Sequence, residues 1–370
     1  MHETPDYPAT ALQEVPLQKH DHPGVPKIEP THFVTGEAER DFESELRKKE
    51  FMEATEKVKD VLLQRLTKKF AQGIGERPLD YHGPEHSLRV SEVTGEFLRV
   101  IRAVDPDLVT EKEVALGKLV GIAHDLVQDA EPEEEGKNLK RKVVHNELAS
   151  AEGLLEEMGK YGHSDGLPVF DTENEHFRNG ITEDIRVTIP KFESVSLPGD
   201  GNKYPRVSQE HLTSKSSLIA LALASADLRG EFMKGKNPEN FFHSGNAEFR
   251  EYSLTIRQDL NRGVENIPPE RKAKISGEIL QWKKNQVGFA KWQQILFRES
   301  VEGNEMIANS PKAEEIKKAL FEMFNGFDRV IEATEDLSAR LEAKYGHLRE
   351  AGSHSADDSA FKNLLSEMGY

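Results

Sequence analysis

The chain contains no cysteine, which narrows its chemistry at once. Disulfide bonds, thiolate zinc sites and cysteine nucleophiles are excluded, so any metal must be held by histidine, aspartate or glutamate. Long apolar runs are also missing. No stretch approaches the roughly 18 apolar residues that a membrane-spanning helix requires, and the N-terminus lacks the apolar core of a signal peptide. The sequence therefore predicts a cytoplasmic protein without a membrane partner.

Positive charge is scarce relative to negative charge. Lysine and arginine total 49 against 66 acidic residues, which gives a net charge of -17 over 370 residues. Because no basic excess is available for a phosphate backbone, we expect no binding to duplex DNA. An acidic protein that handles a phosphate substrate needs cations to offset the repulsion, and bound metal ions are the simplest such cations.

Apolar residues recur every three or four positions along most of the chain, whereas the alternating pattern of strands is nearly absent. The fold class is therefore all-α. Helices are expected near residues 44–70, 82–104, 111–128, 143–158, 177–188, 218–232, 246–262, 269–299, 311–334 and 357–368.

Polarity divides the chain into a central domain and two ends. Residues 1–43 are expected to form a disordered polar tail, and 346–370 a polar C-terminal tail that contributes little to the core. Between them, 44–345 is expected to form one all-helical domain. An extended insertion at about 160–212 is indicated by its many glycine, proline and asparagine residues.

Three short segments carry side chains suited to metal binding. YHGPEH (81–86) opens a helix and places two histidines one turn apart on one face. A second segment ends an apolar helix with His124-Asp125, and a third ends a long apolar run with Asp227. Burying such groups without partners is costly, and a divalent cation would offset that cost. Taken singly, each segment is also compatible with a structural role as surface histidines, a helix-closing hydrogen bond or a cap.

Taken in order, these residues read H…HD…D, each anchored on a helix, and in this the chain resembles the HD superfamily of metal-dependent phosphohydrolases. The resemblance implies an HD-domain helical bundle with additional flanking helices. It also implies that His86, His124, Asp125 and Asp227 bind one or two divalent metal ions. Zinc, manganese, magnesium and iron all suit a ligand set without thiolates.

The sequence is most similar to the cyclic-nucleotide phosphodiesterase branch of that superfamily. Residues 81–90 are similar to its YHNxxHxxDV segment, ADL (226–228) to the segment around its fourth ligand, and NQVGF (285–289) to its purine-holding SQVGF segment. There are departures. HDLVQD (124–129) lacks the second histidine and the PG of HDxxHPG, and Gly83 stands where the family has asparagine. The departures put cyclic-nucleotide specificity in doubt more than metal binding.

The resemblance implies that the protein hydrolyses a phosphoester bond of a small nucleotide-like substrate with a metal-bound hydroxide. Asp125 would bridge two cations if two are bound. His82, one helical turn before the ligand His86, is placed to protonate the leaving oxygen as the general acid.

Further residues are expected around this centre. Gln286 and Phe289 lie one helical turn apart and are expected to bind the substrate by hydrogen bonding and stacking. His145 and Glu147 are expected behind the ligands as acid–base or hydrogen-bonding groups. For Gln286 and Phe289 a surface amide and a core ring are equally compatible with the pattern, as is helix capping for His145.

Three other functions fit the same residues. One is an HD-type nucleotidase that cleaves a phosphomonoester. Another is the di-iron oxygenase branch of the fold, for which His145 is the obvious additional ligand. The third is a non-catalytic helical protein that binds a nucleotide or a partner through a degenerate site; the presence of all four ligand types counts against this reading.

Overall fold

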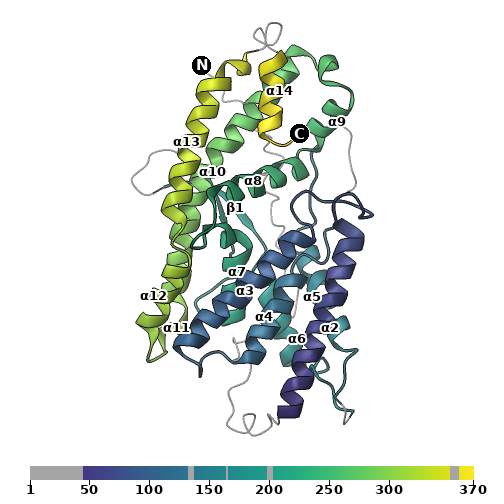
Figure 1. The fold of residues 1–370 in the computed structure, drawn as a ribbon, viewed down its shortest axis with the longest axis vertical. Helices are drawn as coiled ribbons and strands as arrows, with labels where there is room; N and C mark the ends of the chain where they lie inside the picture. The colour runs from purple at the N-terminus through teal and green to yellow at the C-terminus, as the bar shows by residue number, and fades with distance from the viewer. Residues whose placement is uncertain (1–44, 132–136, 164–165, 198–202, 351–357) are drawn as a thin grey trace, which may run out of the picture.

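The computed structural model describes residues 45–131, 137–163, 166–197, 203–350 and 358–370 (Figure 1). The tail expected at 1–43 lies outside the described residues. Helices account for most of what is described, and the strands there are β1 (Lys191–Ser196) and β2 (Lys203–Ser208). The all-α prediction is confirmed. Within the described residues, no helix combines the length and apolar character needed to cross a bilayer.

A first group of helices surrounds the larger apolar core. Helix α3 packs against α4 and α7, and α2 packs against α4 (Figure 1). Every residue from Leu218 to Ala226 of α7 is buried, which explains why this helix is apolar on all sides. The members of this group are α2 (Glu45–Phe70), α3 (Pro84–Val104), α4 (Glu111–Ala123), α5 (His145–Met158), α6 (Glu175–Arg186) and α7 (Leu218–Arg229).

A second apolar core lies among the helices of the C-terminal half. The long helix α10 runs beside α13, and α14 packs against both (Figure 1). Phe249, Ile279 and Leu341 meet in this core. The elements of this half are η2 (Gly230–Phe232), α8 (Pro238–Tyr252), α9 (Leu254–Asn261), η3 (Val264–Asn266), α10 (Pro269–Gly303), α11 (Glu305–Ala308), α12 (Ala313–Met323), α13 (Phe327–Tyr345), η4 (Gly346–Arg349) and α14 (Asp358–Glu367).

The prediction of a C-terminal tail that contributes little to the core is wrong for residues 358–370. Phe361, Leu364 and Met368 are fully buried in the second core. Their spacing of three and four residues forms one apolar helix face, and that face finds its partners in α10 and α13. The Asn246 side-chain amide also donates to the backbone carbonyl of Glu367 at 2.9 Å, which joins this segment to α8.

Two long helices expected from the pattern are each interrupted. The one expected at 246–262 begins earlier, at Pro238, and breaks at Ser253 between α8 and α9. The one expected at 311–334 breaks between α12 and α13. There Gly326 donates its N–H to the carbonyl of Phe232 at 2.9 Å, and a Cβ atom at Gly326 would lie 2.6 Å from that oxygen. The break therefore lets the backbone at Gly326 lie directly against the backbone of Phe232.

The expected insertion contains α6 and the antiparallel hairpin β1–β2, which begins its pairing at Lys191 opposite Ser208. The hairpin lies on α10. Gln293 donates to the carbonyl of Val207 at 2.8 Å, and a Cβ atom at Gly288 would lie 2.4 Å from the ring of Tyr204. Gly288 is thus needed to seat the hairpin on α10.

Candidate metal centre

Four side chains from three parts of the chain lie together where the ends of α3, α4 and α7 meet. Nε2 of His86 is 3.5 Å from Oδ2 of Asp125 and 3.4 Å from Oδ1 of Asp227. Nε2 of His124 is 3.2 Å and 3.6 Å from the same two oxygens. His86, His124 and Asp125 are buried and could hold a metal ion. We call these four side chains the His/Asp cluster.

Helix packing brings the cluster together. His86 lies in the first turn of α3, His124 and Asp125 follow the last turn of α4, and Asp227 lies in the last turn of α7. A Cβ atom at Gly121 would lie 2.7 Å from the Cα atom of Ser91, so this glycine lets α3 and α4 cross closely. Both histidines are thereby directed to the same point.

The atoms that face one another in the cluster lack ordinary partners. Nε2 of His86, Nε2 of His124 and Oδ2 of Asp125 are buried and have no hydrogen-bond partner among the described residues. Buried polar atoms are nearly always bonded, because leaving one unsatisfied costs about 1–3 kcal/mol. Two nitrogens and a carboxylate oxygen are the donor types that a divalent transition metal prefers. These atoms fit a metal ion.

His124 and Asp125, two of the candidate ligands, each make a local hydrogen bond with the atom that points away from the cluster. Nδ1 of His124 lies 2.8 Å from the carbonyl of Gly121, to which it can only donate, so the neutral ring presents a lone pair at Nε2. Oδ1 of Asp125 accepts from the amide of Gln128 at 2.6 Å. Both side chains are held with one atom bonded and the other directed into the cluster.

The charges of the two acids dominate the cluster. Burial by itself lowers the pKa of His124, but Asp125 and Asp227 outweigh it and raise that pKa to about 10. Burial dominates at the other imidazole and lowers the pKa of His86 to about 4. Burial also disfavours the charged form of Asp227, yet its contacts with His124 and His86 hold its pKa below the usual range. The cluster therefore favours a positive charge on His124 and disfavours one on His86.

His82 lies next to the cluster but not on helix α3. The helix begins at Pro84, whose ring disfavours the helical conformation of the residue before it, so the expected pairing of His82 and His86 on one helix face is wrong. The two rings are nevertheless 5.8 Å apart, and His82 is buried. A turn preceding the helix places His82 beside the cluster instead.

Glu251, at the end of α8, holds this histidine. Its Oε1 is 2.6 Å from Nδ1 of His82, and its Oε2 accepts from the backbone N–H groups of Tyr81 and His82 at 2.8 Å and 3.0 Å. Burial alone lowers the pKa of His82, but the charge of Glu251 outweighs it and raises that pKa above the ordinary value. The ring is fixed through Nδ1, which leaves Nε2 on the side away from Glu251.

Two arginines approach the cluster from opposite sides. Arg89 lies 3.0 Å from Nδ1 of His86 and 3.0 Å from Oε1 of Glu231. Arg141 lies 3.3 Å from Nε2 of His82 and 3.6 Å from Oδ1 of Asp125. Arg141 and Glu251 belong to no segment with a recognisable pattern in the sequence, and Arg89 lies within residues 81–90 at a position that the pattern does not specify. The single signal was charge embedded beside apolar residues, which is common.

Of the other residues expected at the site, one lies close to it and one lies at the surface. Glu147 is buried and lies 3.4 Å from Arg141. His145 is exposed and lies 3.6 Å from Asp129, so the structure places it at the surface rather than behind the ligands. Gln286 lies against Gly245 of α8, and Phe289 stacks on Phe241 at 6.2 Å. A substrate-binding role for these last two stays a prediction.

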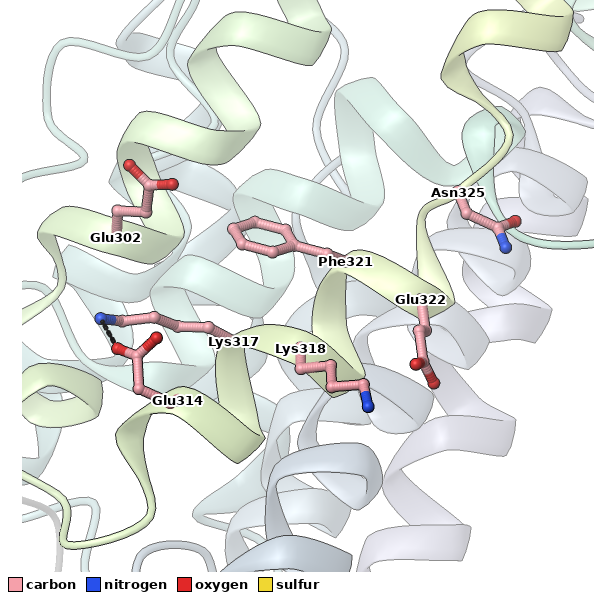
Figure 2. A pocket seen from close by; sticks show the side chains of 7 residues that line it. All are labelled: Glu302, Glu314, Lys317, Lys318, Phe321, Glu322 and Asn325. Carbon is pink, nitrogen blue, oxygen red and sulfur yellow. Dashed lines mark hydrogen bonds and ion pairs between the residues drawn. The ribbon is translucent and has the colours of Figure 1, made fainter.

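A hollow at the protein surface lies elsewhere, beside α12 (Figure 2). Among the described residues that line it are Lys317, Phe321 and Glu322, and none belongs to the His/Asp cluster. Lys317 is already paired with Glu314 at 2.8 Å. Charges of both signs surround a single aromatic ring, so the hollow offers no convergent set of chemical groups.

Comparison of the chain with protein-family models, with curated proteins and with solved structures found no match. Function must therefore be argued from the His/Asp cluster itself.

Proposed function

We propose that the protein is a metal-dependent phosphohydrolase that cleaves a phosphoester bond of a nucleotide-like small molecule. His86, His124, Asp125 and Asp227 would hold one or two divalent ions, with zinc, manganese, magnesium and iron as candidates. The order of these residues along the chain is that of the HD superfamily, which the sequence resembles. The proposal is thus supported by the order of these residues along the chain and by the buried position of His86, His124 and Asp125, whose atoms suit a metal ion.

The observation that carries the proposal is the contact of 2.6 Å between His82 and Glu251 beside the cluster. A buried metal site with purely structural ligands needs no adjacent imidazole held by a carboxylate. In hydrolysis, such an imidazole supplies a proton to the leaving oxygen, and its partner acid keeps the ring oriented. The same arrangement does not favour a passive nucleotide-binding protein.

Each residue then has a distinct task. A divalent ion would supply an activated water molecule and neutralise phosphate charge. Glu251 orients His82 through Nδ1 and favours its protonated form. Nε2 of His82 faces away from Glu251, where it can give its proton to the oxygen that leaves phosphorus. Gln128 holds Oδ1 of Asp125, which leaves Oδ2 as the oxygen that would hold the ion.

Metal analysis followed by a substrate panel tests the proposal. The purified protein should contain a divalent metal in a ratio of about one or two per chain, and His86→Ala should lose it. The control is His243→Ala, because His243 is exposed on α8. The panel should compare 3′,5′-cyclic nucleotides, linear phosphodiesters and nucleoside monophosphates. Hydrolysis of monophosphates alone would favour the nucleotidase, and a metal-loaded protein that hydrolyses none of the panel would overturn the proposal.

A further inference from the structure

Arg141 occupies an unusual position for a buried cation. It lies 3.3 Å from Nε2 of His82, 3.6 Å from Oδ1 of Asp125 and 3.4 Å from Oε1 of Glu147. Its guanidinium therefore lies between the nitrogen that would donate a proton and one of the acids of the His/Asp cluster. About 13% of its side chain is exposed, compared with 6% for Asp125 and 3% for Glu147.

The backbone holds Arg141 in place. Lys142 donates its N–H to the carbonyl of Asp129 at 3.0 Å, and Arg141 pairs with Ala130 across the same short ladder. Asn146 then bonds both the N–H and the carbonyl of Asp129 at 3.0 Å. The segment that carries Arg141 is thus fixed to the one that follows His124 and Asp125.

The side-chain contacts of Arg141, in contrast, are loose. Arginine–carboxylate hydrogen bonds are usually about 2.7–2.9 Å long, and the contacts of Arg141 with Asp125 and Glu147 are both longer. The guanidinium also donates a hydrogen bond to the Tyr252 hydroxyl. Its Nε is buried without a hydrogen-bond partner among the described residues. Arg271 shows the difference, because its Nε lies 2.6 Å from Asp259 in a close ion pair. Arg141 therefore keeps one unsatisfied donor, Nε, and two long contacts with carboxylates.

The other cations near the cluster are less suited to binding a ligand. Arg89 is shared between His86 and Glu231 at 3.0 Å each. Arg229 is fully buried and donates to the carbonyl of Ala224 at 3.1 Å, so a substrate cannot reach it. Arg141 alone among these three contacts both the proposed proton donor, His82, and Asp125 of the His/Asp cluster.

We propose that Arg141 binds the phosphate oxygens of the substrate, and this rests on the proposed phosphohydrolase function. The ligand class is a phosphoryl group with at least two free oxygens on one side, which a planar guanidinium binds in a forked manner. In a protein of net charge -17, this cation also offsets the repulsion that the substrate meets on entry.

Binding by Arg141 has a consequence for His82. A guanidinium only donates hydrogen bonds, so Nε2 of His82 accepts from Arg141 in the present arrangement. When phosphate oxygens draw Arg141 away, the lone pair of that nitrogen is freed, and it must take up a proton from water before it can give one to the leaving oxygen. Phosphate binding at Arg141 would thereby change the partner of Nε2 of His82.

Titration calorimetry with inorganic phosphate as the probe tests this assignment without requiring turnover. Both the metal-free and the manganese-loaded protein should be measured. Arg141→Gln should bind phosphate about 10- to 100-fold more weakly, the range expected for lost charge-assisted hydrogen bonds. Arg141→Lys keeps the charge but not the fork, and should fall between the wild type and Arg141→Gln. Manganese affinity should change much less than phosphate affinity in both variants.

Arg271→Gln is the matched control, since it removes an arginine from a partly exposed ion pair with Asp259 that does not involve the His/Asp cluster. It should leave phosphate affinity unchanged. If Arg141→Gln does not fold, Arg141→Lys still decides the matter through its phosphate affinity. Phosphate affinity equal to that of the wild type, or binding of an adventitious ion insensitive to Arg141, overturns the assignment. Arg141-dependent phosphate binding in a protein that hydrolyses no phosphoester would support the assignment while rejecting the proposed function.

Discussion

The guanidinium of Arg89 donates a hydrogen bond to Nδ1 of His86 across 3.0 Å. Because arginine cannot accept a hydrogen bond, Nδ1 is the acceptor and Nε2 of a neutral His86 carries the proton. A ligating histidine needs the opposite arrangement, with a lone pair at Nε2 and a proton at Nδ1. Metal binding at His86 therefore requires Arg89 to leave this nitrogen.

The first prediction follows from that relationship. Arg89→Gln replaces a donor with an amide whose oxygen can accept from Nδ1, so it should bind manganese more tightly. A gain of about 10-fold would equal the smaller losses that follow when such a hydrogen-bond partner is removed from behind a metal ligand. Titration calorimetry measures the change. Arg89→Met removes the same charge without adding an acceptor, and should gain less. A weaker affinity in Arg89→Gln than in Arg89→Met would contradict this account.

His82→Ala separates proton donation from metal binding. The variant should keep its metal and lose about 10²- to 10⁴-fold in rate, as expected for a positioned acid. The loss should be smaller for a substrate with a good leaving group, which needs no protonation. His86→Ala should lose metal and activity together. Rate constants combined with metal analysis distinguish the two, and loss of metal in His82→Ala would make His82 a ligand instead.

Glu251→Gln should alter the pH profile of the same step. Glu251 raises the pKa of His82, and activity that needs protonated His82 is lost as pH rises through that pKa. Without the carboxylate charge, the alkaline fall in rate should move to lower pH. Initial rates measured across pH reveal the shift. Glu239→Gln, an exposed change on the same helix, should leave the profile in place; an unmoved profile in Glu251→Gln would separate Glu251 from the chemistry.

Asp184 should make stability depend on pH. It is buried, its Oδ1 accepts from Ser217 at 2.5 Å, and its Oδ2 has no partner among the described residues. Burial raises its pKa from 3.8 to about 7, with Glu183 and Glu113 adding to the effect. The folded state therefore keeps this proton to a higher pH than the unfolded chain. Its contribution to the free energy of unfolding should decrease as pH rises from about 4 to 7.

Asp184→Asn tests that sign. At about 1.4 kcal/mol per pKa unit, the gain over wild type at pH 8 is at most about 4 kcal/mol, and it should shrink toward zero near pH 4. Urea denaturation at the two pH values measures the difference. The exposed change Asp171→Asn should show no such dependence. A variant no more stable than wild type at pH 8 would show that Asp184 is stabilised in its charged form.

The C-terminal helix should contribute strongly to stability. Leu364 is fully buried in the second core, so Leu364→Ala should lower the free energy of unfolding by about 2–5 kcal/mol. Lys362→Ala changes an exposed residue on the same helix and should cost little. Thermal or urea unfolding measures both. Equal stabilities would restore the view of this segment as a dispensable tail.

Local spacing in the sequence was sufficient to predict the all-α fold and most helix positions. Apolar residues at intervals of three and four make one face of a helix wherever they occur, so this signal does not depend on the rest of the chain. His86, His124-Asp125 and Asp227 could also be singled out from the sequence, because each lies at the start or the end of an apolar run. The same spacing was present at 361–368, but whether this segment joins the core depended on the surface of α10 and α13 against which it packs.

Only the tertiary structure decided how distant segments meet. Glu251 reaches His82 across 169 residues of chain, and Arg141 reaches it across 59. The close crossing at Gly121 and the turn before Pro84 set the distances within the cluster. Neither Glu251 nor Arg141 has a pattern of its own. Helix periodicity is a property of neighbours along the chain, whereas a binding site is a property of neighbours in space, which packing alone brings together.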